Sequence, residues 1–375
     1  MKGMVNMPNI LDYIKWRGDL NFSQSEFNNV DNLILSRFSY LPLDNLFSKQ
    51  NDTIRNLYLN FLKKGIDREK ILQKEDLDLF PALANSNRFG NLEVTEYINK
   101  IDKMEEKQFS AVSIFIPDGT IYVAYRGTDN TLVGWKEDFN MSLDIDIPSQ
   151  REAVMYWEKV YNEFHKKMRV GGHSKGGNLA MYASIFCNYK VKKKIIEVYN
   201  NDGPGLSKNI VEGDKYKKAL NKINSFIPQT SIIGKLMYHE EKYNIIKSLQ
   251  KGIMQHDLYS WQVEGTDFIH LKEVTNESEL IDEVIKEWTT KFTPEQRSEF
   301  INIIYDIINT TNSETLYEMS KNRFKTVGAI IKAYQKTSKE NKQIISQTLS
   351  ELFGITKNNV YKNFNEKLKN KNSKE

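Results

Sequence analysis

The sequence Gly-Gly-His-Ser-Lys-Gly-Gly occupies residues 171–177 and places one serine among closely spaced glycines. Gly172 and Gly176 stand two residues before and two residues after Ser174, which is the G-x-S-x-G spacing of a nucleophile elbow. In such an elbow the chain turns sharply from a strand into a helix, and glycine is favoured at the flanking positions because both pack closely. The pattern therefore predicts that the turn pushes the Ser174 hydroxyl into the open.

The residues on either side of the elbow have the order that this motif requires. Residues 168–170, Met-Arg-Val, are a short strand candidate, and residues 178–186 are rich in helix formers. A glycine-rich loop that cradles phosphate is the alternative, but the Gly-Lys-Ser/Thr ending of such a loop is missing. The order of strand, serine and helix favours the elbow, with the free amides of the helix N-terminus directed at the serine.

Strand and helix signals alternate in the middle of the chain. Residues 109–116 and 121–125 are β-rich runs around an Asp-Gly turn, which predicts a hairpin. An amphipathic helix over 151–166, the elbow, and a buried strand over 195–199 follow. This alternation predicts an α/β protein with a mostly parallel central sheet flanked by helices. Together with the elbow, it predicts the α/β-hydrolase fold.

Three regions are predicted along the chain. Residues 1–104 show helical patterns without strand signals, and we expect an N-terminal helical segment packed on the core. Residues 105–277 hold the predicted α/β-hydrolase core. Residues 278–375 form a helical C-terminal region, in which the sequence Thr-Pro-Glu-Gln at 293–296 has the composition of a capped helix start.

The composition is that of a folded protein. Of 375 residues, 39% are hydrophobic and 27% charged, and the net charge of +4 comes from interspersed residues, so no nucleic-acid partner is expected. Cys187 is the single cysteine, which excludes an intramolecular disulfide, and it is predicted to be a small buried residue. No run approaches the roughly 18 apolar residues of a membrane span, residues 1–10 do not resemble a secretory signal, and we expect a cytoplasmic protein.

A serine hydroxyl is a weak nucleophile and needs a base to take its proton. His173 stands beside the serine, where its side chain is expected to point elsewhere. His256 falls in a loop after the last predicted strand, which is where α/β-hydrolases place their base, and it follows the serine in chain order. His256 is therefore the predicted base, with His239 and His270 as the alternatives.

Two segments resemble the fungal-type class 3 lipases. They are Val-Ala-Tyr-Arg-Gly-Thr at 123–128 and Gly-His-Ser-Lys-Gly-Gly at 172–177, which match that family's aromatic-Arg-Gly-Thr/Ser strand end and Gly-His-Ser-Leu-Gly-Gly elbow. The resemblance covers about residues 105–265 and implies that Thr128 donates to the oxyanion through its amide and its hydroxyl. The amide of Lys175, the residue after the serine, is the second expected donor.

Nearly the whole chain also resembles a bacterial group of lipase-like α/β-hydrolases of unassigned substrate. The shared segments are Gly-Trp-Lys-Glu-Asp at 134–138 and Gln-His-Asp at 255–257. Within the first of them, the charged residues Lys136, Glu137 and Asp138 are interpreted as solvated surface, because such residues are usually exposed.

Two positions depart from the class 3 pattern. Lys175 replaces the usual leucine, which leaves the backbone amide available. Residues 225–231, where the resemblance places the acid of the triad, contain no carboxylate. Asp202 is the predicted acid because it follows a strand end and keeps the order Ser, Asp, His, although Asp-Gly is also ordinary turn chemistry. Glu240 is the alternative, and Asp257 lies too close in sequence to the predicted base.

These residues predict a serine esterase or lipase-like hydrolase that forms an acyl-enzyme on Ser174, with a small-molecule or lipid ester as substrate. The alternative is a catalytically inactive α/β-hydrolase scaffold that binds a lipid or protein partner, because the class 3 aspartate is missing and the helical C-terminal region is long. No cofactor is expected, and no metal, because Asp144 and Asp146 lack a further ligand pattern.

Overall fold

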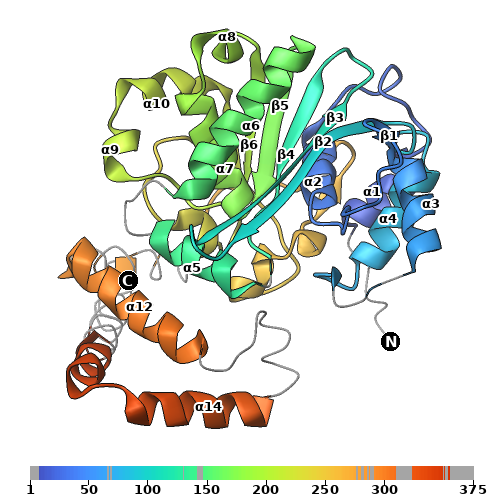
Figure 1. Ribbon diagram of the computed structural model, residues 1–375. Coiled ribbons are helices and arrows are strands. Elements are labelled where there is room, and N and C mark those ends of the chain that lie inside the picture. The colour runs from blue at the N-terminus through green and yellow to red at the C-terminus, as the bar shows by residue number, and fades with distance from the viewer. Residues whose placement is uncertain are drawn as a thin grey trace, which may run out of the picture.

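The computed structural model describes residues 8–275 except 66, 68, 69, 130 and 142–146, and beyond them residues 278, 279, 283, 284, 287, 291–309, 323–348, 350 and 354. Its central element is an eight-stranded sheet whose strands follow chain order (Figure 1). Neighbours from β1 to β4 pair antiparallel, and those from β4 to β8 pair parallel, so the predicted mostly parallel α/β sheet is confirmed. The strands are β1 (Asp52–Thr53), β2 (Glu93–Asp102), β3 (Lys107–Phe115), β4 (Ile121–Tyr125), β5 (Met168–His173), β6 (Ile195–Asn201), β7 (Ile223–Pro228) and β8 (Tyr243–Ile246).

The helices that connect the parallel strands pack on one face of the sheet. From β4 to β8 each strand lies next to the one before it, and the order always advances in the same direction across the sheet. Because crossovers between parallel strands are right-handed, their helices all lie on the same face. In β4, Ile121, Val123 and Tyr125 face these helices, whereas Tyr122 and Ala124 face the other core. The connecting helices are α5 (Leu132–Met141), α6 (Pro148–Phe164), α7 (Lys175–Phe186), α8 (Tyr189–Lys192), α9 (Lys208–Val211), α10 (Asp214–Ala219) and the 3₁₀ helix η2 (Leu220–Lys222).

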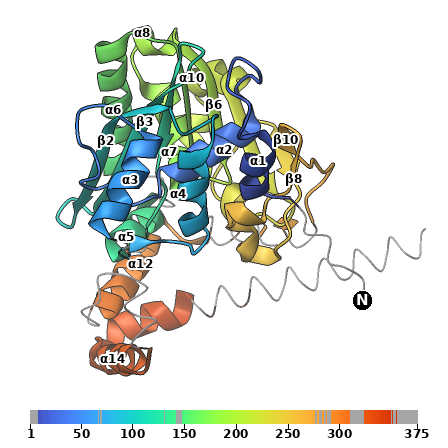
Figure 2. The same ribbon diagram turned by 90° about the vertical axis from the view of Figure 1, so that its right-hand side faces the viewer.

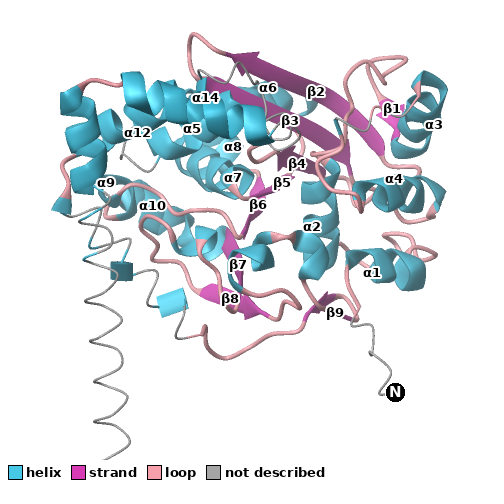
Figure 3. Ribbon diagram, turned by 90° about the horizontal axis from the view of Figure 1, so that it is seen from below, coloured by secondary structure: helices cyan, strands magenta, loops and turns pink. Residues whose placement is uncertain are grey.

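Helices from the N-terminal part of the chain cover the opposite face, and Figure 3 shows α2 and α7 on opposite sides of β5. Asn9 and Asn28 each form a capping box with the third residue of the helix that follows, which fixes where α1 and α2 begin. A buried ion pair of 2.5 Å between Arg88 and Asp31 ties this layer together. Its helices are α1 (Ile10–Arg17), α2 (Asn29–Phe38), α3 (Ile54–Lys64) and α4 (Asp76–Asn85).

Strands also occur before residue 105, where the sequence pattern predicted helices alone. β2 lies next to the short edge strand β1 and pairs along its length with β3. A β-bulge between Thr95 and Ile98 shifts the register, and the second half of the strand is partly exposed. The bulge interrupts the alternation of apolar and polar residues by which a strand is recognised in sequence.

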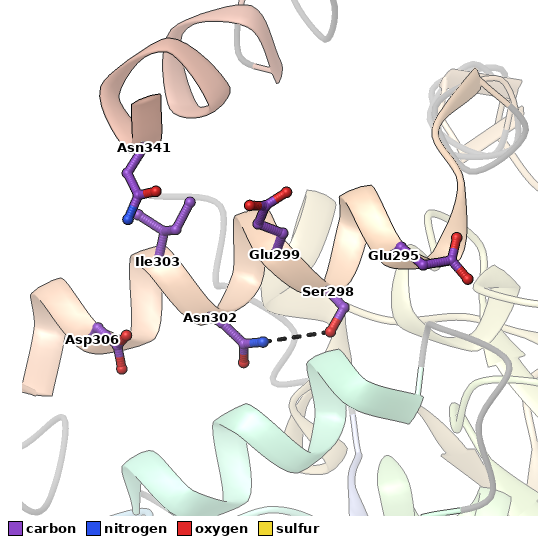
Figure 4. Close-up of a pocket in the computed structure, with 7 residues that line it drawn as sticks. All are labelled: Glu295, Ser298, Glu299, Asn302, Ile303, Asp306 and Asn341. Atoms are coloured by element: carbon purple, nitrogen blue, oxygen red, sulfur yellow. Dashed lines mark hydrogen bonds between the residues drawn. The ribbon is translucent and has the colours of Figure 1, made fainter. Parts of the chain in front are cut away.

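The C-terminal region contains α12 (Pro294–Asn309) and α14 (Arg323–Lys336), which contact each other. An apolar cluster joins Ile303 and Ile307 of α12 to Ile345, which follows α14, and Ile330 and Ala333 of α14 pack against it. The predicted capping box before α12 is present, since Thr293 and Gln296 exchange hydrogen bonds. The pair lies beyond α5, on the far side of the molecule from α8 (Figures 1 and 2). Residues of α12, polar except for Ile303, line a cavity of about 480 Å³ together with Asn341 (Figure 4). In the described part of the chain, no helix is long and apolar enough to span a membrane.

Candidate active site

The elbow forms as the sequence predicts. Ser174 lies between the end of β5 and the start of α7, with φ 58° and ψ −133°. A positive φ is costly for a residue with a side chain, so the surrounding structure holds Ser174 in a strained turn. A Cβ atom added to Gly176 would lie 2.2 Å from the carbonyl oxygen of Tyr125, and one added to Gly172 would lie 2.3 Å from the Gly176 backbone. These approaches explain the glycines on both sides of the serine.

Asp202 and His256 are brought into contact although they are 54 residues apart in sequence. The imidazole Nδ1 of His256 donates to Oδ2 of Asp202 at 2.7 Å. Asp202 directly follows β6 and its side chain is 1% exposed, whereas His256, at the end of the 3₁₀ helix η4 (Gly252–His256), is 25% exposed. The predicted acid is therefore sealed from water, while the predicted base keeps access to it.

The second carboxylate oxygen of Asp202 is held by the segment after β7. Its Oδ1 accepts the Ser231 hydroxyl at 2.5 Å and the Gly234 amide at 3.2 Å. Ser231 ends the stretch 225–231, in which the class 3 pattern would have placed a carboxylate. In this chain the same stretch supplies a hydroxyl that positions the carboxylate of the neighbouring strand. Ser231 and Gly234 could not be predicted from the sequence, because no motif distinguishes them from ordinary turn residues.

His173 and Tyr40 connect the elbow to the loop of His256. Nε2 of His173 lies 2.9 Å from the carbonyl oxygen of His256, which can only accept, so Nε2 carries the proton. The two imidazole rings lie 4.3 Å apart. Tyr40 donates to the carbonyl oxygen of His173 at 3.1 Å and accepts the Gly127 amide at 3.0 Å. Burial lowers the pKa of His173 well below its ordinary value, and the charges of His256 and Arg37 add to this, so His173 is neutral at pH 7.

The segment that follows β4 lies against the elbow. A Cβ atom added to Gly127 would approach the Cβ of Ser174 to 3.1 Å, which places Thr128, the next residue, beside the serine turn. The Thr128 hydroxyl donates to Oδ2 of Asp138 at 2.5 Å. The lipase resemblance implies that this hydroxyl donates to the oxyanion. In the structure it donates instead to a carboxylate of α5.

The Lys175 side chain points into the protein and forms a fully buried ion pair. Its Nζ lies 2.8 Å from Oε2 of Glu137 and 2.9 Å from both the carbonyl oxygen and Oε1 of Gln108. Glu137 in turn accepts the amides of Gln108 and Ser149, both at 3.0 Å. The prediction that Glu137 is solvated surface is therefore wrong, because its side chain is 0% exposed and every charge in the network has a partner.

Asp138, the neighbour of Glu137 on α5, carries an unusual carboxyl group. Its Oδ1 is buried and has no hydrogen-bond partner among the described residues. Burial raises the pKa of Asp138 to about 6, although the charge of Lys175 and the hydrogen bond from Thr128 lower it. The prediction of solvated surface is wrong here as well, because the side chain is partly buried and accepts the Thr128 hydroxyl.

The alternative base and acid residues have other partners. Nδ1 of His239 lies 2.8 Å from Glu241, and the exposed His270 lies 3.2 Å from Asp267. Among the described residues, Glu240 makes no hydrogen bond to a histidine; its amide donates to Tyr216. Two other sequence candidates are placed as follows: Asp257 caps the 3₁₀ helix η5 (Leu258–Ser260), and Cys187 is buried as predicted, with a thiol pKa raised by burial to about 12.

No group of three or more residues that suit a metal ion occurs in the part of the chain that the structure describes. Asp144 and Asp146, the paired carboxylates of the sequence, lie outside the described residues.

A mostly parallel sheet, a serine elbow after a central strand, and a His-Asp pair at the carboxyl ends of the strands define a lipase-like α/β-hydrolase fold. The chain belongs to the Mbeg1-like family, whose model matches residues 83–306, more than half of the sequence. This assignment agrees with the resemblance to a lipase-like α/β-hydrolase family. A search of curated proteins gives no match.

The structure is similar to solved structures of lipases, at low sequence identity. Rhizomucor miehei lipase in a propeptide complex is 15% identical, with a TM-score of 0.32 over 41% of this chain and 57% of that one. A fungal lipase bound to an inhibitor is 13% identical, with a TM-score of 0.35 over 45% and 69%. M37 lipase is 16% identical, with a TM-score of 0.34 over 54% and 68%. The chain thus spans little more than half the length of the Rhizomucor miehei lipase.

Proposed function

We propose that the protein is a serine hydrolase that cleaves carboxylic esters through an acyl-enzyme on Ser174. The observation that carries this proposal is the 2.7 Å hydrogen bond from His256 to the buried Asp202. The ring of His256 lies beside that of His173, the residue that directly precedes the strained serine. A serine in a sharp turn and a histidine oriented by a buried carboxylate are the groups that acyl transfer requires.

In the proposed reaction, Oγ of Ser174 attacks the ester carbonyl carbon while Nε2 of His256 takes the hydroxyl proton. Asp202 holds the other ring proton on Nδ1 and stabilises the imidazolium that forms. The tetrahedral intermediate collapses, the bond to the leaving oxygen breaks, and His256 returns the proton to the departing alcohol. Water then attacks the acyl-enzyme through the same proton transfers and releases the carboxylic acid and free Ser174.

The oxyanion of each tetrahedral intermediate is assigned to backbone amides. The amide of Lys175 begins α7, where the helix N-terminus adds a partial positive charge, and the amide of Thr128 comes from the adjacent segment. We assign no donation to the Thr128 hydroxyl, because it is engaged with Asp138. Loss of a single oxyanion donor typically lowers kcat by about 10² to 10³.

A fluorophosphonate probe, which labels only an activated serine, tests the proposal. We expect the wild-type chain to be labelled and to hydrolyse p-nitrophenyl esters, and Ser174→Ala to do neither. Ser184→Ala, a substitution of a buried serine farther along α7, is the matched control and should label like the wild type. A well-folded wild-type sample that takes no label would instead favour the inactive scaffold. Esters of graded acyl length would then define the substrate class.

A further inference from the structure

A second cavity lies at the opposite end of the sheet from Ser174. It has a volume of about 520 Å³ and is formed by α8, the start of β6, α10 and η2. Ile195 lies in its wall and begins β6, whereas Asp202 follows the end of that strand, and seven residues of strand span roughly 20 Å. The cavity is therefore separate from the candidate active site. We call it the lysine pocket after Lys192, Lys193, Lys215, Lys218 and Lys222, which line it.

The positive charge of the lysine pocket is not neutralised by a carboxylate of the residues that the structure describes. No aspartate or glutamate lines it, and none of its five lysines forms an ion pair with another described residue. Elsewhere, by contrast, Lys100, Lys107 and Lys159 each pair with a glutamate. The carboxyl ends of α7 and α10 each contribute about half a negative charge, which offsets roughly one of the five positive charges. The pocket thus concentrates an excess of positive charge.

Three of the five ammonium groups are held in place by neutral partners. Nζ of Lys222 donates to the carbonyl oxygen of Ile195 at 2.7 Å. Nζ of Lys193 lies 4.4 Å from the centre of the Tyr189 ring, and Nζ of Lys215 lies 5.4 Å from that of Phe186. Such contacts fix the direction of the side chains without cancelling their charge. The pocket is therefore organised in advance for an anion.

We propose that the lysine pocket binds a small molecule that carries two phosphate groups and an apolar or aromatic body. A phosphate group carries about two negative charges, so a pair of phosphates matches the excess positive charge. The apolar side chains of Ile195, Val198 and Ala219, with the Tyr189 ring, offer a surface for the uncharged part of the ligand. The volume falls within the range of small-molecule sites, about 300 to 1,000 Å³, and the concave shape suits a compact ligand better than a nucleic-acid strand.

The test is calorimetric titration of the full chain with ADP, with inorganic pyrophosphate and with adenosine, at one fixed ionic strength. We expect ADP to bind best, pyrophosphate more weakly, and adenosine more weakly still. The double variant Lys215→Gln/Lys218→Gln removes two exposed charges of the pocket and should weaken ADP binding at least tenfold. Lys49→Gln/Lys63→Gln removes two exposed charges from the N-terminal region and should leave binding unchanged.

Three results would overturn the proposal that the lysine pocket binds such a ligand. Equal weakening of ADP binding in both double variants would mean general electrostatic attraction and would overturn the proposal, as would the absence of ADP and pyrophosphate binding at millimolar concentration. Binding of anionic phospholipid vesicles or single-stranded DNA in preference to ADP would also overturn it. Both double variants should hydrolyse p-nitrophenyl butyrate like the wild type, and Ser174→Ala should bind ADP normally. Failure of the lysine pocket is thereby distinguishable from failure of the proposed esterase.

Discussion

Two pairs of ionisable side chains flank the Ser174 turn, and they differ in their access to water. Nδ1 of His256 and Oδ2 of Asp202 are 2.7 Å apart, with side chains 25% and 1% exposed. Nζ of Lys175 and Oε2 of Glu137 are 2.8 Å apart, and both side chains are 0% exposed. The distances are almost equal, so proximity alone does not identify a catalytic pair. Only the first pair keeps the access to solvent that proton transfer to a bound molecule requires, whereas the second is closed to it.

The sealed pair joins four segments that meet behind the serine. Lys175 belongs to the elbow, Glu137 to α5, Gln108 to β3, and Ser149 to the first turn of α6. All three ammonium donors of Lys175 have acceptors within hydrogen-bond distance. A buried ion pair of this kind adds little net stability, but it is costly to break on one side only. The comparison therefore predicts a loss of turnover from one pair and a loss of folding from the other.

Asp202→Asn should have the largest effect, because it disrupts the solvent-accessible His256–Asp202 pair without changing the side-chain volume. The amide cannot hold the ring proton of His256 as the carboxylate does, and we expect kcat for p-nitrophenyl butyrate to fall by about 10³ to 10⁴ with folding retained. Such a decrease corresponds to roughly 4 to 5 kcal/mol in the activation barrier. Asp257→Asn is the control and should keep nearly full turnover. If Asp202→Asn kept full turnover while Glu240→Gln lost it, the acid would be misassigned.

Lys175→Met should have the next largest effect, and on stability. It leaves Glu137 buried and charged without its cation, and we expect the free energy of unfolding in urea to fall by about 3 to 5 kcal/mol. The double variant Lys175→Met/Glu137→Leu removes both charges and should recover most of that loss. A double variant as unstable as the single one would show that lost packing, not an unpaired charge, is responsible.

The parts of the site that could be predicted from the sequence are those set by local geometry. The elbow is encoded in seven consecutive residues, because only glycine fits beside the turn at Ser174. Asp202 and His256 could be predicted because the carboxyl ends of parallel strands meet at one edge of a sheet, so residues that follow different strands come together there.

The remaining residues depend on contacts between distant segments. Glu137 and Asp138 look like surface residues in the sequence, and only the packing of α5 over β3 and the elbow buries Glu137 and partly covers Asp138. Tyr40 follows α2 in the N-terminal helical layer, and it reaches the site because α2 packs on β5, the strand that ends at His173. β2 was missed because its bulge between Thr95 and Ile98 disrupts the alternation of a strand. None of these contacts has a signature within a short stretch of sequence.

Tyr40→Phe should have a smaller effect than Lys175→Met, since it removes a neutral hydroxyl that hydrogen-bonds to Gly127 and His173. The Gly127 amide would lose its acceptor in a buried position, which costs about 1 to 3 kcal/mol in the free energy of unfolding. Because the same hydroxyl supports the His173 carbonyl, we also expect kcat to fall while KM changes little. Tyr189→Phe, at an exposed tyrosine far from the site, is the control. Unchanged kcat in Tyr40→Phe would restrict this residue to a purely structural role.

Asp138→Asn should have the smallest effect, visible as a change in pH dependence. The pKa of Asp138 is about 6 in the folded protein against an ordinary 3.8, so between these values the folded state binds more protons than the unfolded one. Stability contributed by the protonated group is therefore complete below pH 4 and is lost as pH rises to 6. One pKa unit corresponds to about 1.4 kcal/mol, and with partial solvent screening we expect a loss of about 1 to 2 kcal/mol.

Asp138→Asn carries no titrating group at this position and should lack that loss. Urea unfolding of both proteins at pH 4 and pH 7 isolates the contribution, because the other carboxyl groups titrate alike in both and cancel in the difference. A stability difference between the two proteins that stays constant from pH 4 to pH 7 would contradict the raised pKa. The sealed side of the Ser174 turn would then consist of the Lys175–Glu137 pair alone, and the carboxylate that accepts the Thr128 hydroxyl would be ionised throughout this range.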